Sequence, residues 1–168
     1  MTSMQLLIIS DTHLPGRARD LPDELWAQVP QADVVFHAGD WVGAALLDRL
    51  TDRARRVVGV YGNNDGPDLR ARLPETARVE LGGLRVTVVH ETGGRNNRER
   101  RMDLLYAADT DVLVFGHSHI PWDTVSPAGL RLLNPGSPTD RRRQPRCTFL
   151  TATVRDGGLH DVELAAVG

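Results

Sequence analysis

Seven side chains that can bind metal ions occur at five places in the chain, each directly after an apolar run. They are three carboxylate or amide groups and four imidazoles: Asp11, His13, Asp40, Asn63, His90, His117 and His119. The intervals between successive places are 29, 23, 27 and 27 residues, counted from Asp11 to His117. A strand, a crossover and the next parallel strand take roughly 30 residues. We therefore expect these groups to meet at the carboxyl ends of neighbouring strands, where open α/β sheets form their sites.

The types of ligand indicate two metal ions. Asp11 and His13 are two residues apart, as are His117 and His119, so on an extended segment each pair would point the same way. Gly116 would free the backbone to turn before the second pair. Seven ligands are too many for one tetrahedral zinc ion, and mixed oxygen and imidazole ligands suit Mn, Fe, Ni or Zn. With one bridging carboxylate they would hold two ions, an arrangement that hydrolyses phosphate esters.

The first half of the chain alternates between strand and helix patterns. Short apolar runs predict strands over residues 5–10, 33–37 and 56–60, and helical spacing of apolar residues predicts helices over 20–29 and 42–50. Asp20 is a candidate N-cap, with Pro22 in the first turn of its helix. This order predicts parallel strands in a layered α/β domain.

The second half is richer in hairpin signals. Predicted strands 77–81 and 84–90 flank Gly82-Gly83, and two further pairs flank turn residues: 124–126 with 130–133, and 147–154 with 159–164. A surface helix over 96–107 and a strand over 111–115 complete the pattern. We expect mostly antiparallel strands here. The whole chain, 1–168, then forms a single domain with two sheets and helices on the outer faces.

Composition excludes several other classes of protein. The net charge of −2 creates no general attraction for nucleic acid or an anionic membrane. Cys147 is the only cysteine, so an internal disulfide is excluded. The first residues lack the positive region of a signal peptide, and no apolar run approaches the roughly 18 residues of a membrane span. We expect a cytoplasmic protein with no membrane or nucleic-acid partner, and edge strands leave a homo-oligomer open.

The five motifs together resemble those of the calcineurin-like metallophosphoesterases. In chain order they are Ser-Asp-Thr-His, Ala-Gly-Asp, Gly-Asn-Asn-Asp, a His after a strand, and Gly-His-Ser-His. The chain length, the lack of a capping insertion and the segment Asn134-Pro135-Gly136-Ser137 resemble the small bacterial and archaeal phosphodiesterase branch. The resemblance implies a four-layer α/β/β/α sandwich. It also implies a dinuclear phosphodiesterase in which a metal-bridging hydroxide attacks a small phosphodiester substrate.

The resemblance also implies roles for individual residues. One metal ion would be held by Asp11, His13, Asp40 and His119. Asp40 would bridge to a second ion that is also held by Asn63, His90 and His117. Manganese is the expected metal, with nickel, iron and zinc as alternatives. Asp40, Asn63 and Asn64 are the predicted catalytic residues, and substrate contacts are expected from Thr12, Asn64, Asn134 and Ser137.

Two positions depart from the usual family pattern. Asn64 stands where many members have a histidine that assists the leaving group, and an amide cannot donate a proton in that way. Activated diesters should therefore react faster than alkyl monoesters. Glu91 replaces the glycine that usually follows His90, which adds a negative charge near the metals.

Other readings remain open. The run Arg141-Arg142-Arg143 would suit a second phosphate group, but such a run is more often a solvated loop. His37 is expected to support the ligands rather than bind metal, and His160 to be structural. The alternative function is an inactive interaction scaffold, as in the retromer subunit that resembles this family. A DNA nuclease and a dinucleotide polyphosphate hydrolase fit the sequence less well.

Overall fold

The computed structural model describes residues 2–168, so Met1 of the predicted domain lies outside it. The strands are β1 (Met4–Ile9), β2 (Val34–His37), β3 (Val57–Gly59), β4 (Thr76–Leu81), β5 (Leu84–Val89), β6 (Val112–Val114), β7 (Trp122–Val125), β8 (Arg131–Asn134), β9 (Thr148–Arg155) and β10 (Gly158–Ala166). The helices are α1 (Asp23–Gln28), α2 (Ala44–Arg53), α3 (Pro67–Arg72), α4 (Arg98–Tyr106) and the short 3₁₀ helix η1 (Val29–Gln31).

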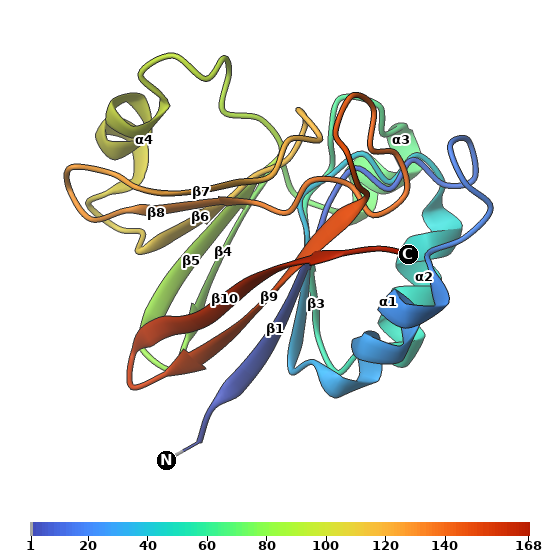
Figure 1. Cartoon of the computed structure of the whole chain (residues 1–168), viewed down its shortest axis with the longest axis horizontal. Helices are drawn as coiled ribbons and strands as arrows, with labels where there is room; N and C mark the ends of the chain where they lie inside the picture. Colours follow the sequence, from blue (N-terminus) through green and yellow to red (C-terminus); the bar gives the residue numbers. More distant parts are fainter. Residues whose placement is uncertain (1) are drawn as a thin grey trace.

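The strands form two five-stranded mixed sheets that face each other (Figure 1). In the first sheet the order is β10-β9-β1-β2-β3, with β1, β2 and β3 parallel and the β9–β10 hairpin antiparallel beside β1. In the second sheet the order is β4-β5-β6-β8-β7, with β5, β6 and β8 parallel. The predicted α/β fold with two mixed sheets and outer helices is confirmed.

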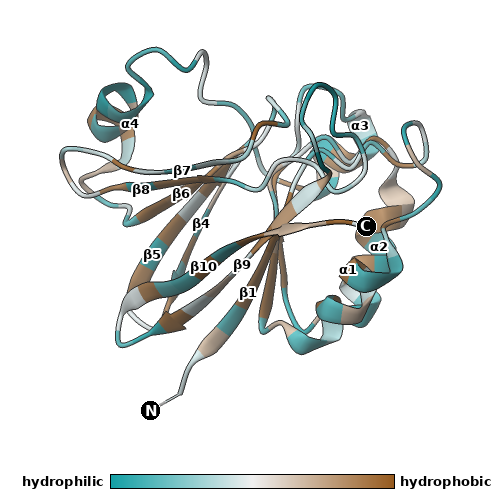
Figure 2. Ribbon diagram, in the orientation of Figure 1, coloured by the Kyte–Doolittle hydropathy of each residue, from teal (hydrophilic) through white to brown (hydrophobic). Residues whose placement is uncertain are grey.

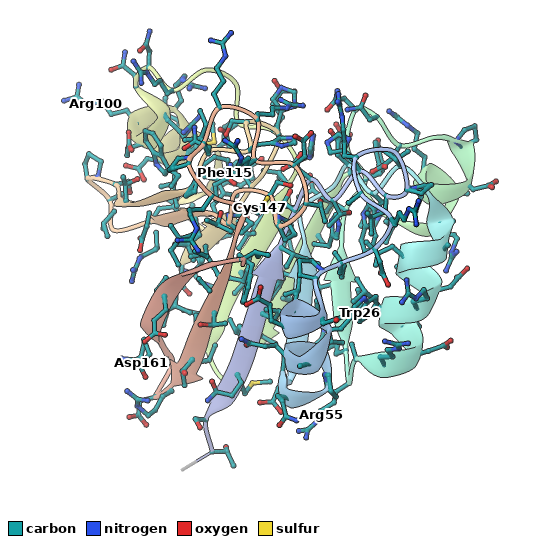
Figure 3. The ribbon with its side chains drawn as sticks, turned by 45° about the vertical axis from the view of Figure 1, so that its right-hand side comes forward. Trp26, Arg55, Arg100, Phe115, Cys147 and Asp161 are labelled. Atoms are coloured by element: carbon teal, nitrogen blue, oxygen red, sulfur yellow. The ribbon has the colours of Figure 1, made fainter. Side chains whose placement is uncertain are left out.

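Three apolar cores hold the layers together. The central core lies between the sheets and includes Ile8, Phe36, Val88 and Val114. A second core packs α1 and α2 against the first sheet, and a third packs α4 against the second sheet through Met102. Figure 2 shows the apolar strands of the sandwich centre, and Figure 3 labels Trp26 and Phe115 in the two outer cores. Among the helices described between residues 2 and 168, none is long and apolar enough to cross a membrane.

Local structure differs from the sequence prediction at a few boundaries. Helix α1 begins at Asp23, and its N-cap position is Pro22, so Asp20 is not the cap. Helix α2 begins at Ala44, because Val42 has a positive φ of 75°, which is incompatible with a right-handed helix. Helix α3 was not predicted, although Pro67 at its first position is a helix-start signal.

Candidate metal centre

The predicted ligands come together at the carboxyl ends of strands from both sheets. Two clusters form, in each of which the ligand atoms lie within 4.8 Å of one another. The first cluster is Asp11, His13 and His119, and the second is Asp40, His90 and His117. Asp11 and His13 follow β1, Asp40 follows β2, His90 follows β5, and His117 and His119 follow β6. The crossover interval holds within each sheet, where β1, β2 and β3 and then β5 and β6 are parallel neighbours. It does not hold between Asn63 and His90, because the chain there passes through the antiparallel strand β4 into the second sheet.

Asp40 belongs to the second cluster and also approaches the first. Its Oδ2 atom is 3.6 Å from His13 Nε2 in the first cluster and 3.4 Å from His90 Nε2 in the second. Asn64 holds this carboxylate from the other side, because its backbone N–H donates to Oδ1 at 2.9 Å and its side-chain amide to Oδ2 at 2.8 Å. A carboxylate placed in this way is suited to bridge two ions.

Asn63 completes the second cluster. Its Oδ1 atom lies 2.9 Å from His90 Nε2 and 3.1 Å from His117 Nδ1. The other nitrogen of His90, Nδ1, donates to the carbonyl of Ala38 at 2.7 Å. In a neutral His90 ring, Nε2 is then an acceptor that faces the acceptor oxygens of Asn63 and Asp40. Such a set of facing acceptors needs a proton or a metal ion between them.

The first cluster also fits a metal ion. Asp11 Oδ1, His13 Nε2 and His119 Nε2 are buried and have no hydrogen-bond partner. Buried polar atoms of this kind are costly unless they are satisfied. The Nδ1 atom of His119 donates to the carbonyl of Asp140 at 2.6 Å, which leaves the Nε2 lone pair free to bind. Outer contacts of this kind orient histidine ligands in metal sites, so the donor set fits a cation.

The pKa values of the cluster residues follow from burial. Burial raises the pKa of Asp11 to about 7, and it lowers that of His119 to about 4. Burial also lowers the pKa of His13, which favours its neutral form. Burial alone would raise the pKa of Asp40. Hydrogen bonds from His90 and Asn64 have the larger effect, and they lower the pKa below its ordinary value. The metal-free site thus carries strongly perturbed groups, as functional sites commonly do.

The backbone at the two pairs of ligands is not extended. Asp11, His13, His117 and His119 have φ values of 55°, 46°, 75° and 62°. The expectation that each pair lies on an extended segment is therefore wrong, because β1 and β6 end before their ligands and the chain turns there. Positive φ values at non-glycine residues are costly and cluster at functional sites.

Gly116 is needed for space and not for a turn. The structure gives it no positive φ, but a Cβ atom there would lie 2.1 Å from Ser10 Oγ and 2.6 Å from Asp11 Oδ2. The backbone N–H of His117 donates to the same Asp11 oxygen at 2.9 Å. The absence of a side chain at Gly116 therefore lets the two ligand loops meet.

Three residues expected to contact substrate are buried beneath the site instead. Thr12 Oγ1 is 2.9 Å from Nε2 of His37. His37 is buried and through this contact supports the loop after β1. Ser137 Oγ donates to the Asp11 carbonyl, and Asn134 Nδ2 donates to the Gly116 carbonyl. All three side chains are buried, and their hydrogen bonds connect the loops that carry the ligands.

Asp65 is a supporting residue that the sequence reasoning missed. Its carboxylate accepts hydrogen bonds from the backbone N–H groups of Asp40, Val42 and Gly62, at 3.0, 2.7 and 2.7 Å. It therefore ties the loop after β2 to the loop after β3. Asp65 is the last residue of the Gly-Asn-Asn-Asp motif, which was the available signal.

The remaining candidates lie around the site or away from it. Glu91 Oε1 is 3.7 Å from His117 Nε2, so its charge does lie beside the second cluster. Arg141, Arg142 and Arg143 are exposed. His160 Nε2 is 3.0 Å from the carbonyl of Arg155, a contact within the β9–β10 hairpin.

Known proteins share this fold. Solved structures include a Thermotoga maritima protein that is 30% identical, with a TM-score of 0.76 over 98% of this chain and 99% of that chain. Vps29 from Entamoeba histolytica is 24% identical, with a TM-score of 0.74 over 98% of this chain and 100% of that chain, and this likeness concerns the fold alone.

Sequence comparison agrees with the structural likeness. A probable metallophosphoesterase of Methanocaldococcus jannaschii is 35% identical over 147 residues, which cover 86% of this chain and 71% of that protein. The model of the calcineurin-like phosphoesterase superfamily domain matches residues 4–157, which include both ligand clusters. The chain therefore belongs to the calcineurin-like phosphoesterase superfamily.

Proposed function

We propose that this protein is a dinuclear metal-dependent phosphoesterase that prefers diesters to monoesters. The observation that carries the proposal is the pair of ligand clusters, in which Asp40 of the second cluster also lies beside His13 of the first. Asp11, His13, Asp40 and His119 would hold one ion, and Asp40, Asn63, His90 and His117 the other. When bound, two such ions supply Lewis-acid stabilisation of the phosphate and an activated water. Mn²⁺ is the metal we expect, and Ni²⁺, Fe²⁺ and Zn²⁺ suit the same ligands.

Asn64 bears on the leaving group, and the charge of the site bears on the choice between diester and monoester. The side-chain amide of Asn64 donates to Asp40, and an amide cannot protonate a departing alkoxide. Substrates whose leaving group departs without a proton should therefore react fastest. Aryl diesters meet this condition and carry one negative charge fewer than a fully ionised monoester. The lower charge also suits a site that contains Glu91 beside His117.

The test compares bis-p-nitrophenyl phosphate with p-nitrophenyl phosphate. Chelated protein is titrated in turn with Mn²⁺, Ni²⁺, Zn²⁺ and Mg²⁺, and both release of p-nitrophenol and bound metal are measured. We expect metal-dependent cleavage that is much faster for the diester than for the monoester. Asp40→Ala should lose activity and metal together, whereas Asp52→Ala, a change at an exposed residue of α2, should lose neither.

Two results would contradict the proposal. Monoester cleavage faster than diester cleavage would refute the preference, and a fully metallated, active Asp40→Ala variant would refute the bridging role. A wild-type protein that binds no metal and cleaves neither ester would favour the interaction scaffold.

A further inference from the structure

A cavity opens directly beside the second ligand cluster. Its volume is about 310 Å³, and Asn63 and His90 form part of its wall. A group that fills this space would therefore be adjacent to any phosphate held at the cluster. The volume lies at the lower end of the range for small-molecule sites, so the cavity suits one ring-bearing substituent and not a long polymer.

Two tyrosines give the cavity aromatic surfaces. Tyr61 lies in the loop after β3, and Tyr106 is the last residue of α4. The guanidinium of Arg70 lies 4.6 Å from the centre of the Tyr61 ring, and its Nε donates to the carbonyl of Asp65 at 2.7 Å. Arg70 and Tyr61 are thus held against the loop that carries Asn63. Flat aromatic and guanidinium surfaces of this kind stack on planar rings.

The polar groups of the cavity favour hydrogen-bond donors over anions. Glu75, Thr76 and Glu91 line it together with Arg70. The carboxylates of Glu75 and Glu91 outnumber the single guanidinium of Arg70, so the wall of the cavity has a net negative charge. This charge would repel an additional phosphate. Carboxylates accept hydrogen bonds from hydroxyl and amino groups, and a carboxylate is a common partner of ribose hydroxyls.

From these features we propose that the cavity binds a nucleoside as one ester arm of the substrate. The base stacks against the tyrosines, and the sugar hydroxyls or base amino groups donate to Glu75 and Glu91. This assignment rests on the proposed phosphodiesterase function and narrows its substrate class to nucleoside phosphodiesters. A bare alkyl arm would leave the cavity unfilled, and an arm with a further phosphate would meet the negative wall.

The test compares two aryl diesters that release the same p-nitrophenol. One is adenosine 5′-(p-nitrophenyl phosphate), which carries a base amino group and both ribose hydroxyls, and the other is methyl p-nitrophenyl phosphate, which lacks the nucleoside. Metal-loaded protein should give a kcat/KM that is about tenfold or more higher for the adenosine ester, the size expected from base stacking. In Tyr106→Leu and Glu75→Gln the ratio of the two kcat/KM values should fall about fivefold or more.

Matched controls exist on the same elements. Leu104→Ala changes an exposed residue of α4, and Glu80→Gln removes a charge from β4, and neither residue lines the cavity. Both controls should keep the wild-type ratio. Equal cleavage of the two esters by the wild type, or an unchanged ratio in Tyr106→Leu and Glu75→Gln, would overturn the assignment. Failure to cleave either ester would instead refute the proposed function.

Discussion

At the scale of single residues, the candidate metal site is marked by buried polar atoms that lack hydrogen-bond partners. Asp11 Oδ1 has no hydrogen bond, although Oδ2 accepts from Ser10 Oγ and from the backbone N–H of His117. Burial raises the pKa of this carboxyl to about 7, against an ordinary value of 3.8. The folded metal-free protein therefore holds a proton that the unfolded chain has already released. Its stability must fall as the pH rises through this interval.

Asp11→Asn should accordingly separate stability from metal binding. The amide keeps the acceptor for Ser10 and His117 but carries no charge. At pH 8 the chelated variant should be more stable than chelated wild type by about 1–3 kcal/mol, because a buried charge is removed. At pH 4 the difference should be small. Urea unfolding of both proteins in chelator, at pH 8 and at pH 4, measures these differences in the free energy of unfolding.

The same variant should bind metal poorly at its first cluster. Added Mn²⁺ should therefore raise its melting temperature less than that of wild type. Asp52→Asn, at an exposed position of α2, serves as the control and should match wild type in both assays. A chelated Asp11→Asn protein less stable than wild type at pH 8 would contradict the assigned pKa.

At the scale of elements, the ligand loops are held by contacts that link neighbouring segments. Asp65 joins the loops after β2 and β3, and Ser137 braces the loop after β1. On the outer face of the first sheet, Asp20 accepts hydrogen bonds from Trp26 of α1 and from Arg49 of α2. Asp20 does not cap a helix, but it connects the loop after the first ligand pair to both helices.

Asp20→Asn should lower stability in a pH-dependent way. The hydrogen bond from Arg49 is the main reason that the pKa of Asp20 is lowered to about 2. The contribution of a lowered carboxyl pKa is complete above its ordinary value of 3.8 and is lost as the pH falls towards 2. Since the pair is partly exposed, we expect a loss of about 0.5–1 kcal/mol at pH 7.

Chemical denaturation of wild type and Asp20→Asn across pH 7 to pH 3 measures this effect. The difference should shrink at the acidic end, whereas Asp52→Asn should show little difference throughout. A constant difference over the whole range would mean that the Asp20 charge makes no contribution.

At the scale of the whole molecule, the candidate metal centre is built from both sheets. Asp11 and Asp40 follow strands of the first sheet, whereas His90 and His119 follow strands of the second. The central apolar core already packs the sheets together, and Gly116 allows their ligand loops to touch. Bound ions would therefore act as cross-links at one edge of the sandwich, in addition to any chemical role.

Metal loading should consequently stabilise the fold and not only activate it. A ligand that binds only the folded state contributes about 2.7 kcal/mol at a concentration 100 times its dissociation constant. Adding Mn²⁺ to chelated protein should raise the melting temperature and slow amide exchange in the loops after β1 and β6. Asp40→Ala, which lacks the shared carboxylate, should respond much less. An unchanged melting temperature with two bound ions would show that the ions do not link the sheets.

Much of this protein was predictable from local sequence signals. Alternating apolar runs and the two glycines at 82 and 83 predicted most strands and a hairpin, and both glycines do have positive φ values. The interval of one strand and crossover predicted that Asp11 and Asp40 follow neighbouring parallel strands, and that His90 and His117 do so as well. These features depend on chain periodicity and on ligand chemistry, both of which are encoded in nearby residues.

Other features depend on contacts between residues far apart in the chain. The sequence alone determined the types of the candidate ligands, the parallel strands of the opening units and the expectation of two ions. The tertiary structure decided that Thr12, Asn134 and Ser137 are buried braces, that Gly116 is needed for space, and that a cavity lies beside His90. The reason is physical: burial and close approach are set by what the other loops bring to the same point, and no local pattern encodes that.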